Sequence, residues 1–260
     1  IVVEGYGPMT TVGELCRITR EVAGGPIAAE VVGFRGDRVL LMPLGDMHGI
    51  GPGSRITMSG QVANLAVGPG LLGRVLDGCG NPMDGKGPLT ATERYPLYAG
   101  APNPLQRARL RIPLDLGVRA INGFLTCGRG QKMGIFSGSG VGKSVLLGMI
   151  SRYTKADVNV IALIGERGRE VNEFLERDLG AEALGRSVVV VATSDQAPLI
   201  RLRAALVATT IAEYFRDVGK QVLLLMDSLT RLAYSQREVG LAIGEPPTTK
   251  GYTPSVFTLL

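Results

Sequence analysis

The residues best suited to chemistry form one short glycine-rich segment, Ser137-Gly138-Ser139-Gly140-Val141-Gly142-Lys143-Ser144. Glycines let a backbone curl so that successive N–H groups point at a single anion. Lys143 adds a flexible cation for β and γ phosphates, and Ser144 adds a hydroxyl that can bind Mg²⁺. The segment therefore predicts a loop that cradles nucleotide phosphates, with Val145 in the first turn of a helix whose positive end faces them.

One position departs from the usual phosphate-loop pattern G-x-x-x-x-G-K-[ST], because Ser137 stands where the first glycine is expected. A small residue can make the same turn wherever the backbone needs no positive φ. A glycine-rich surface turn with a solvated lysine is the plainer alternative. A dinucleotide fingerprint, G-x-G-x-x-G, is disfavoured, because Lys143 stands where the third small residue is required.

Two acidic residues follow apolar runs that are typical of buried strands. Ligands of open α/β sheets collect beyond the carboxyl ends of the strands, so such residues are candidates for a site. Asp227 directly follows the run 222–226 and could hold Mg²⁺ or its water beside the glycine-rich segment. Capping the next helix is the alternative role for Asp227, and it does not exclude the metal.

A second apolar run, 158–164, is followed by Gly165 and then by Glu166, which begins a dense charge cluster that extends to Glu170. The Glu166 carboxylate could orient the water that attacks a γ-phosphoryl group, and Arg167 could balance the charge. The alternative is that Glu166 and Glu170 cap the following helix while the arginines are solvated. The residues alone leave these two interpretations open.

The pattern of apolar residues divides the chain into three segments, of which the last must position the candidate site residues. The first part, 1–67, has short alternating apolar runs and tight turns, which indicates a small β-barrel or sandwich. Residues 68–113 are rich in glycine and proline and are interpreted as a connector with one strand-like segment at 71–76. In 114–260 apolar runs alternate with helical stretches, which predicts an α/β fold with a parallel sheet. Its strands are expected at 133–136, 158–164, 187–192 and 222–226.

Composition excludes several other classes of protein. The 260 residues are 45% hydrophobic and 20% charged, enough for a sizeable core, and no apolar run approaches the roughly 20 residues that cross a bilayer. Three separated cysteines fit neither a disulfide framework nor a zinc site, and the single histidine, His48, lies in a loop-like stretch. The net charge is +5, but the lysines and arginines are scattered along the chain and tryptophan is absent, so nucleic acid is not an expected partner.

Three motifs together give the chain a resemblance to the type III protein-export ATPases: the glycine-rich segment, Gly165-Glu166-Arg167-Gly168-Arg169-Glu170, and Leu224-Leu225-Met226-Asp227-Ser228-Leu229-Thr230-Arg231. Residues 242–252 and 103–107 are similar to the flagellar branch of that family. Residues 190–195 and 135–137 are similar to the virulence injectisome branch instead. These ATPases are related to the catalytic subunits of rotary ATPases.

The resemblance implies an N-terminal β-barrel, a RecA-like P-loop NTPase core and a helical C-terminal domain that is absent from this chain. It implies ATP and Mg²⁺ as ligands, with phosphates bound from Gly138 to Ser144, Mg²⁺ supported by Ser144 and Asp227, water activated by Glu166, and Arg167 near the γ-phosphate. It also implies a homohexamer in which a neighbouring subunit supplies an arginine. We expect that arginine and most of the adenine pocket to belong to sequence beyond Leu260.

The function implied by the resemblance is Mg²⁺-dependent ATP hydrolysis that drives protein export, in the cytoplasm and peripheral to an inner-membrane export gate. Stalk and stator proteins, export substrates and chaperones are the implied partners. A non-catalytic ring subunit is one rival, but it would lack the carboxylate of Glu166. An RNA translocase with a RecA-type core is another, yet only Tyr6 and Phe34 could serve as stacking platforms in the barrel part.

Overall fold

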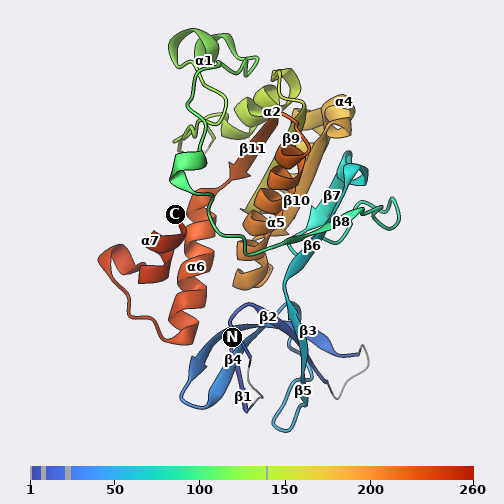
Figure 1. Cartoon of the computed structure of the whole chain (residues 1–260), viewed down its shortest axis with the longest axis vertical. Coiled ribbons are helices and arrows are strands. Elements are labelled where there is room, and N and C mark those ends of the chain that lie inside the picture. Colours follow the sequence, from blue (N-terminus) through green and yellow to red (C-terminus); the bar gives the residue numbers. More distant parts are fainter. Residues whose placement is uncertain (1, 7–9, 21–24, 139) are drawn as a thin grey trace.

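The computed structural model describes residues 2–6, 10–20, 25–138 and 140–260 of the chain, so Ser139 of the glycine-rich segment lies outside the described residues. Two sheets with flanking helices make up the fold, and the first sheet lies below the second in Figure 1. The first sheet is antiparallel throughout, in the order β1-β4-β3-β2-β5. Its strands are β1 (Val3–Tyr6), β2 (Glu14–Ile18), β3 (Ile27–Arg35), β4 (Arg38–Pro43) and β5 (Ile56–Val62).

The first sheet curls around a small apolar core of its own. This core contains Cys16, Ile18, Ala29, Val31 and Leu41, which come from β2, β3 and β4. The two edge strands also approach each other, because a Cβ placed on Gly5 of β1 would collide with the side chain of Ile56 in β5. The alternating apolar runs of the first part therefore form a barrel rather than a flat sheet.

The second sheet is parallel and is covered on both faces. Its order is β11-β9-β10-β7, with β7 (Arg74–Asp77), β9 (Val158–Glu166), β10 (Ser187–Thr193) and β11 (Val222–Asp227). Val160 and Ala162 of β9 face the core that includes α5 (Pro198–Asp217). Ile161 and Leu163 face the core that includes α2 (Lys143–Tyr153), α3 (Gly168–Glu173) and α4 (Gly180–Gly185). This period of two explains why these strands are almost wholly apolar, and it confirms the predicted α/β architecture.

Two expected strands differ from the structure. Residues 133–136 form no strand, and Phe136 is 96% exposed. Ile135 packs on the same apolar cluster as Leu223 and Leu225 of β11. Among the described residues, however, β11 pairs only with β9, so 133–136 contributes a side chain to this cluster without joining the backbone hydrogen bonds of the sheet. The strand expected at 71–76 begins instead at Arg74, because Leu71 lies in a 3₁₀ turn (Pro69–Leu71).

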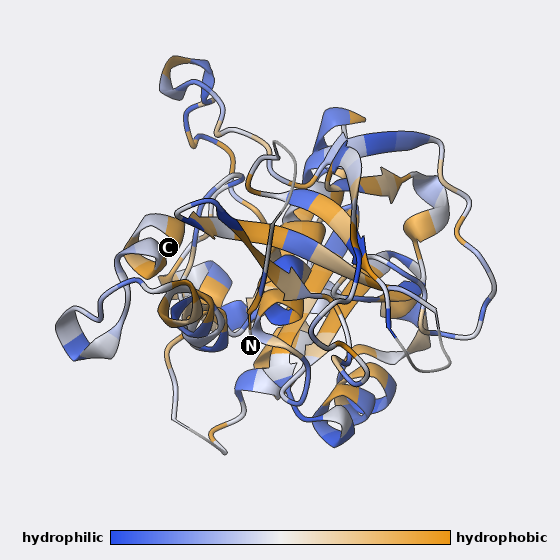
Figure 2. Cartoon of the chain, turned by 90° about the horizontal axis from the view of Figure 1, so that it is seen from below, coloured by the Kyte–Doolittle hydropathy of each residue, from blue (hydrophilic) through white to orange (hydrophobic). Residues whose placement is uncertain are grey.

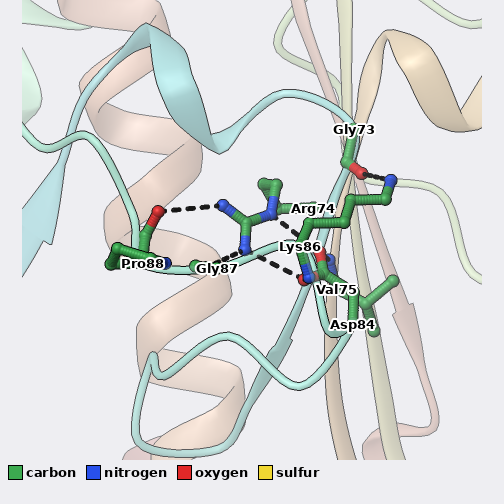
Figure 3. Close-up of polar contacts among 7 residues, drawn as sticks. All are labelled: Gly73, Arg74, Val75, Asp84, Lys86, Gly87 and Pro88. Carbon is green, nitrogen blue, oxygen red and sulfur yellow. Dashed lines mark hydrogen bonds and ion pairs between the residues drawn. The ribbon is translucent and has the colours of Figure 1, made fainter.

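The segment 68–113 contributes an edge strand to the second sheet, because β7 pairs in parallel with β10. A polar network centred on Arg74 fastens the chain that follows β7 (Figure 3). The Arg74 guanidinium donates to Asp84 at 2.8 and 2.9 Å and to the Gly87 carbonyl at 2.7 Å. Lys86 donates to the Gly73 carbonyl at 2.8 Å. Part-buried hydrogen bonds of Arg74 and an exposed one of Lys86 therefore fix the segment that follows β7.

The remaining elements surround the two sheets. A two-stranded ribbon of β6 (Asn64–Val67) and β8 (Glu93–Pro96) runs between them, and α1 (Arg119–Phe124), α6 (Leu229–Ile243) and α7 (Pro254–Leu259) complete the described fold. Figure 2 shows hydrophobic residues concentrated in the central strands, with hydrophilic residues toward the periphery. No helix among the described residues is long and apolar enough to span a bilayer.

A buried ion pair joins the barrel to α5. Glu30 of β3 accepts from Arg203 of α5 and also from the hydroxyl of Tyr98, and the side chains of Glu30 and Arg203 are both almost fully buried. Buried charges are stable only when they are paired. The contact therefore fixes the barrel on the first turns of α5, 173 residues away in sequence.

We predict that Arg203→Met lowers the free energy of unfolding by about 3–5 kcal/mol, because it leaves the Glu30 carboxylate buried and unpaired. The double variant Glu30→Gln/Arg203→Met should recover much of that loss, since no charge is then stranded. Urea unfolding at fixed pH measures both effects. Arg216→Met, which removes a 58% exposed partner of Asp217, is the control and should cost less than about 1 kcal/mol. Equal losses in Arg203→Met and in this control would contradict the prediction.

Candidate active site

The glycine-rich segment 137–144, which we call the glycine loop, leads into the N-terminus of α2. Gly140 and Gly142 have φ angles of 75° and 94°, in the left-handed region that favours glycine, and a Cβ on either would meet open space. Gly142 is the N-cap of α2, which begins at Lys143. The first N–H groups of a helix have no partners within it, and they carry its positive dipole end. The loop and the helix therefore present unblocked backbone donors to an anion.

The opposite end of α2 is held by Arg186. Its guanidinium donates to the carbonyls of Ser151, Arg152, Thr154 and Ala156 at distances between 2.8 and 3.2 Å. These carbonyls lie at or just beyond the C-terminus of α2, where a helix leaves acceptors unsatisfied and where its dipole favours a cation. The cap fixes the position of α2 and, with it, the starting point of the glycine loop.

Lys143 and Asp227 meet at the carboxyl end of the parallel sheet. Asp227 is the buried last residue of β11, and its Oδ1 accepts a hydrogen bond from Lys143 Nζ. The peptide bond that follows Asp227 is cis. Ser228, not Asp227, caps α6, because its side chain accepts from the N–H of Arg231 at 3.4 Å. The Asp227 carboxylate is therefore directed at the glycine loop rather than used as a helix cap.

Glu166 closes the neighbouring strand, β9, and its side chain is only 16% exposed. Arg231 of α6 reaches it, with Nε 3.3 Å from Oε1. The preceding residue makes this approach possible: Gly165 has φ 72°, and a Cβ there would lie 2.8 Å from Arg231 Cδ. Only a residue without a side chain lets the arginine lie over the end of β9.

The pKa of Glu166 is raised to about 7, chiefly because burial disfavours its charged form. A hydrogen bond with the carboxyl group of Glu170 and the negative charges of Asp227 and Glu170 add to the increase, and the positive charge of Arg231 opposes it. The same hydrogen bond lowers the pKa of Glu170. Near neutral pH, Glu166 can therefore both hold and release a proton.

The structure brings three of the candidate residues from the sequence together and leaves others apart. Lys143 contacts Asp227, and the charge of Asp227 acts on Glu166. Arg167 is 71% exposed and pairs with Glu170 at 3.6 Å, with no contact to Lys143 or Asp227 in the described part of the chain. The remaining candidates of the glycine loop and helix start are exposed where they are described: Ser137, Gly138, Gly140, Val141, Gly142, Ser144 and Val145.

Sequence reasoning missed Arg231 as the partner of Glu166, and it gave Glu170 only the alternative role of a helix cap. Arg231 lies in the first turn of α6, four residues after Asp227, so the end of one strand and the start of one helix supply both groups. The signal available in the sequence is Gly165, since a glycine immediately before a buried carboxylate marks a close approach by another chain segment. The partner in that approach is visible only in the fold.

Comparison with known families identifies both parts of the chain. Residues 117–260 match the ATP synthase alpha/beta family, nucleotide-binding domain. Residues 2–60 match the beta-barrel domain of the same family. The first range contains β9, β10 and β11 of the parallel sheet with their helices, and the second contains nearly all of the N-terminal barrel, whereas β7 lies outside both ranges.

Individual relatives cover nearly all of the chain. A flagellum-specific ATP synthase of Pseudomonas aeruginosa is 55% identical over 262 residues, which cover 100% of this chain and 58% of the relative. A type 3 secretion system ATPase of Xanthomonas euvesicatoria is 52% identical over 254 residues, which cover 98% of this chain and 58% of the relative. The chain thus spans little more than half the length of these curated relatives.

The fold matches solved structures of a related ATPase. The assembled ATPase EscN from the type III secretion system of enteropathogenic E. coli superimposes with a TM-score of 0.91 at 47% identity, over 99% of this chain and 62% of that chain. EscN in complex with its central stalk EscO gives the same TM-score and identity. The barrel and the parallel sheet of the present chain therefore have the same arrangement as in EscN.

We predict that Glu166→Gln makes the protein progressively more stable than the native chain as the pH rises from about 5 to about 8. The folded pKa near 7 exceeds the ordinary value of 4.5, so the folded state binds more protons between these values, and the free energy of unfolding falls as the pH rises. Glutamine does not titrate. The difference should grow by something on the order of 1 kcal/mol after solvent screening.

Urea unfolding across this pH range measures the effect on stability. Glu182→Gln, at an exposed position in α4, is the matched control and should follow the native profile. If the Glu166→Gln and native profiles run parallel across the range, the pKa of Glu166 is not raised.

Proposed function

Because this chain belongs to the ATP synthase alpha/beta family, we propose that it is the barrel and nucleotide-binding part of an ATPase that drives protein export through a type III secretion apparatus of the flagellar kind. One observation carries the proposal. Lys143 at the start of α2, Asp227 at the end of β11 and Glu166 at the end of β9 converge on one edge of the parallel sheet. That edge is where ligands bind in open α/β sheets.

We assign phosphate binding to the glycine loop. The assignment covers Ser137 to Ser144, with Val145 in the first turn of α2. The positive φ angles of Gly140 and Gly142 and the dipole of the 11-residue helix that follows support it. Lys143 supplies the positive charge for the β and γ phosphates of ATP. In the structure this lysine donates a hydrogen bond to Asp227, and a phosphate group could replace that carboxylate as its anionic partner.

We assign Mg²⁺ to the hydroxyl of Ser144 and the carboxylate of Asp227. Hydroxyl and carboxylate oxygens are the ligands that Mg²⁺ prefers, and the rest of its shell comes from phosphates and water. The buried carboxylate of Asp227 fits this role, because its only ion-pair partner in the described structure is Lys143, which a phosphate group can take over. Bound Mg²⁺ would neutralise charge on the phosphate oxygens.

We assign the attacking water to Glu166. A general base works best when its pKa lies near the working pH, and burial gives Glu166 this property. Arg231 holds its carboxylate in place through the 3.3 Å contact. Arg167, whose exposed guanidinium pairs with Glu170 at 3.6 Å, is the cation that we assign to the γ-phosphate. A non-catalytic ring subunit would have no use for this set of carboxylates.

We extend the assembly of EscN to this protein as a proposal. The protein would form a homohexamer in the cytoplasm, bind a central stalk as EscN binds EscO, and associate peripherally with an inner-membrane export gate. Stator proteins, export substrates and chaperones would be its further partners.

We propose that the chain is divided into 1–67, 68–113 and 114–260, with the middle segment supplying β7 to the parallel sheet. Similarity to both secretion branches keeps an injectisome ATPase as the alternative.

We predict that Lys143→Ala weakens binding of Mg²⁺–ATP to the chain by at least about tenfold, because it removes a charge-assisted contact to the phosphates. Glu166→Gln should leave binding nearly unchanged but lower turnover in the full-length protein by at least about a hundredfold. Calorimetric titration measures binding, and release of phosphate measures turnover. Lys155→Ala, which removes an exposed lysine just beyond α2, is the matched control.

Unchanged turnover in Glu166→Gln would overturn the assignment of the base, and unchanged binding in Lys143→Ala would overturn the phosphate loop. Turnover that strictly requires RNA would instead support the RNA translocase and contradict a role in export.

A further inference from the structure

A second positively charged site lies between α5 and α6. A pocket of about 230 Å³ is lined by Arg201, Arg231, Tyr234, Arg237 and Glu238. We propose that this pocket, which we call the arginine pocket, binds inorganic phosphate independently of the glycine loop. The roles assigned above to Lys143, Asp227 and Glu166 make no use of Arg201 or Arg237.

The charges of the arginine pocket do not balance. Arg201 pairs with Glu238 at 2.9 Å, and Arg231 pairs with Glu166 at 3.3 Å. Arg237 makes no hydrogen bond or ion pair within the described part of the chain, although it is half-buried. A partly desolvated guanidinium without an acceptor is unfavourable, and a bound anion would relieve that cost. The pocket therefore lacks one negative group.

The shape and chemistry of the pocket favour a small tetrahedral oxyanion. Guanidinium groups are planar forks that match the oxygens of phosphate, and several oxygens can serve more than one arginine at once. The volume is below the range of pockets that enclose drug-sized ligands, which disfavours a whole nucleotide. Tyr234 stacks on Tyr252 with ring centroids 6.0 Å apart and planes at 9°, so one wall of the pocket is fixed.

Arg231 connects the arginine pocket to the candidate active site. Arg231 lines the pocket, and its Nε lies 3.3 Å from Oε1 of Glu166, the residue to which we assign the attacking water. If the chain hydrolyses ATP, phosphate is the anion released beside Glu166, and the pocket is placed to receive it. This link to the product rests on the proposed function, whereas phosphate binding by the pocket does not.

The test is phosphate binding in the absence of nucleotide. Lys143→Ala serves as the background, because it removes the cation of the glycine loop, and inorganic phosphate is titrated at constant ionic strength by calorimetry and ³¹P NMR. We expect saturable binding in this background. Adding Arg237→Gln should weaken it by at least about tenfold, since a charged hydrogen-bond donor is lost. Arg237→Lys, which keeps the charge but not the fork, should give an intermediate loss.

Arg216→Gln in the same background is the matched control, because Arg216 is an exposed arginine at the far end of α5. Circular dichroism and urea unfolding establish that each variant is folded, and Arg201→Gln provides a second variant if Arg237→Gln is not. An absence of saturable binding, an unchanged affinity in Arg237→Gln, or an equal loss in Arg216→Gln would each overturn the proposal.

Self-association offers one further outcome. Sedimentation measures whether the chain associates with itself. If Arg237→Gln abolishes that association without changing phosphate affinity, the pocket holds an acidic side chain of a second copy. The phosphate proposal is then wrong. Because ATP is absent throughout, failure of this test would leave the proposed hydrolysis standing, and failure of the turnover test would leave phosphate binding standing.

Discussion

The register between β9 and β11 is the constraint on which the site depends. Asp227 is paired with Leu163, and β9 ends three residues later at Glu166, so both carboxylates emerge at one edge of the sheet. A buried polar residue holds β9 in place: Asn159 donates to the Ser151 carbonyl of α2 at 2.9 Å and to Ser187 Oγ of β10 at 3.2 Å. A slip of one residue would break these bonds and turn alternate side chains toward the wrong core.

The charged side chains at this edge are paired with one another within the protein. Asp227 is compensated by Lys143, while Glu166 faces Arg231 and shares a hydrogen bond with Glu170. Glu170 also pairs with Arg167 at 3.6 Å. Burial makes a negative charge on Glu166 costly, and the protein reduces this cost by keeping Glu166 largely protonated below its pKa of about 7. In the proposed function, a ligand that brings both phosphates and a metal ion would exchange these internal contacts for new ones, and its binding would then be coupled to proton release at Glu166.

The sequence predicted the elements that depend mainly on residues near one another in the chain, namely the buried strands and the glycine loop. The apolar runs that form β9, β10 and β11 are long enough to be buried on both faces. The glycines of the glycine loop indicate the positive φ angles that the structure has at Gly140 and Gly142. Residues 133–136 are equally apolar, but a strand needs a neighbour, and pairing is not written in the segment itself. The contacts of Arg231 with Glu166 and of Arg203 with Glu30 join residues 65 and 173 positions apart, so only the folded chain reveals them.

The first turns of α5 contact both the barrel, through Arg203, and α6, through Arg201. Arg201 and Arg203 are two residues apart, and positions i and i+2 of a helix point about 200° apart around its axis. Arg203 accordingly contacts the barrel through Glu30, while Arg201 lines the arginine pocket on the side of α6 and pairs with Glu238. Arg231, which lines the same pocket from α6, pairs with Glu166 at the end of β9. The start of α5 therefore lies between the contact with the barrel on one side and the pocket beside the candidate active site on the other.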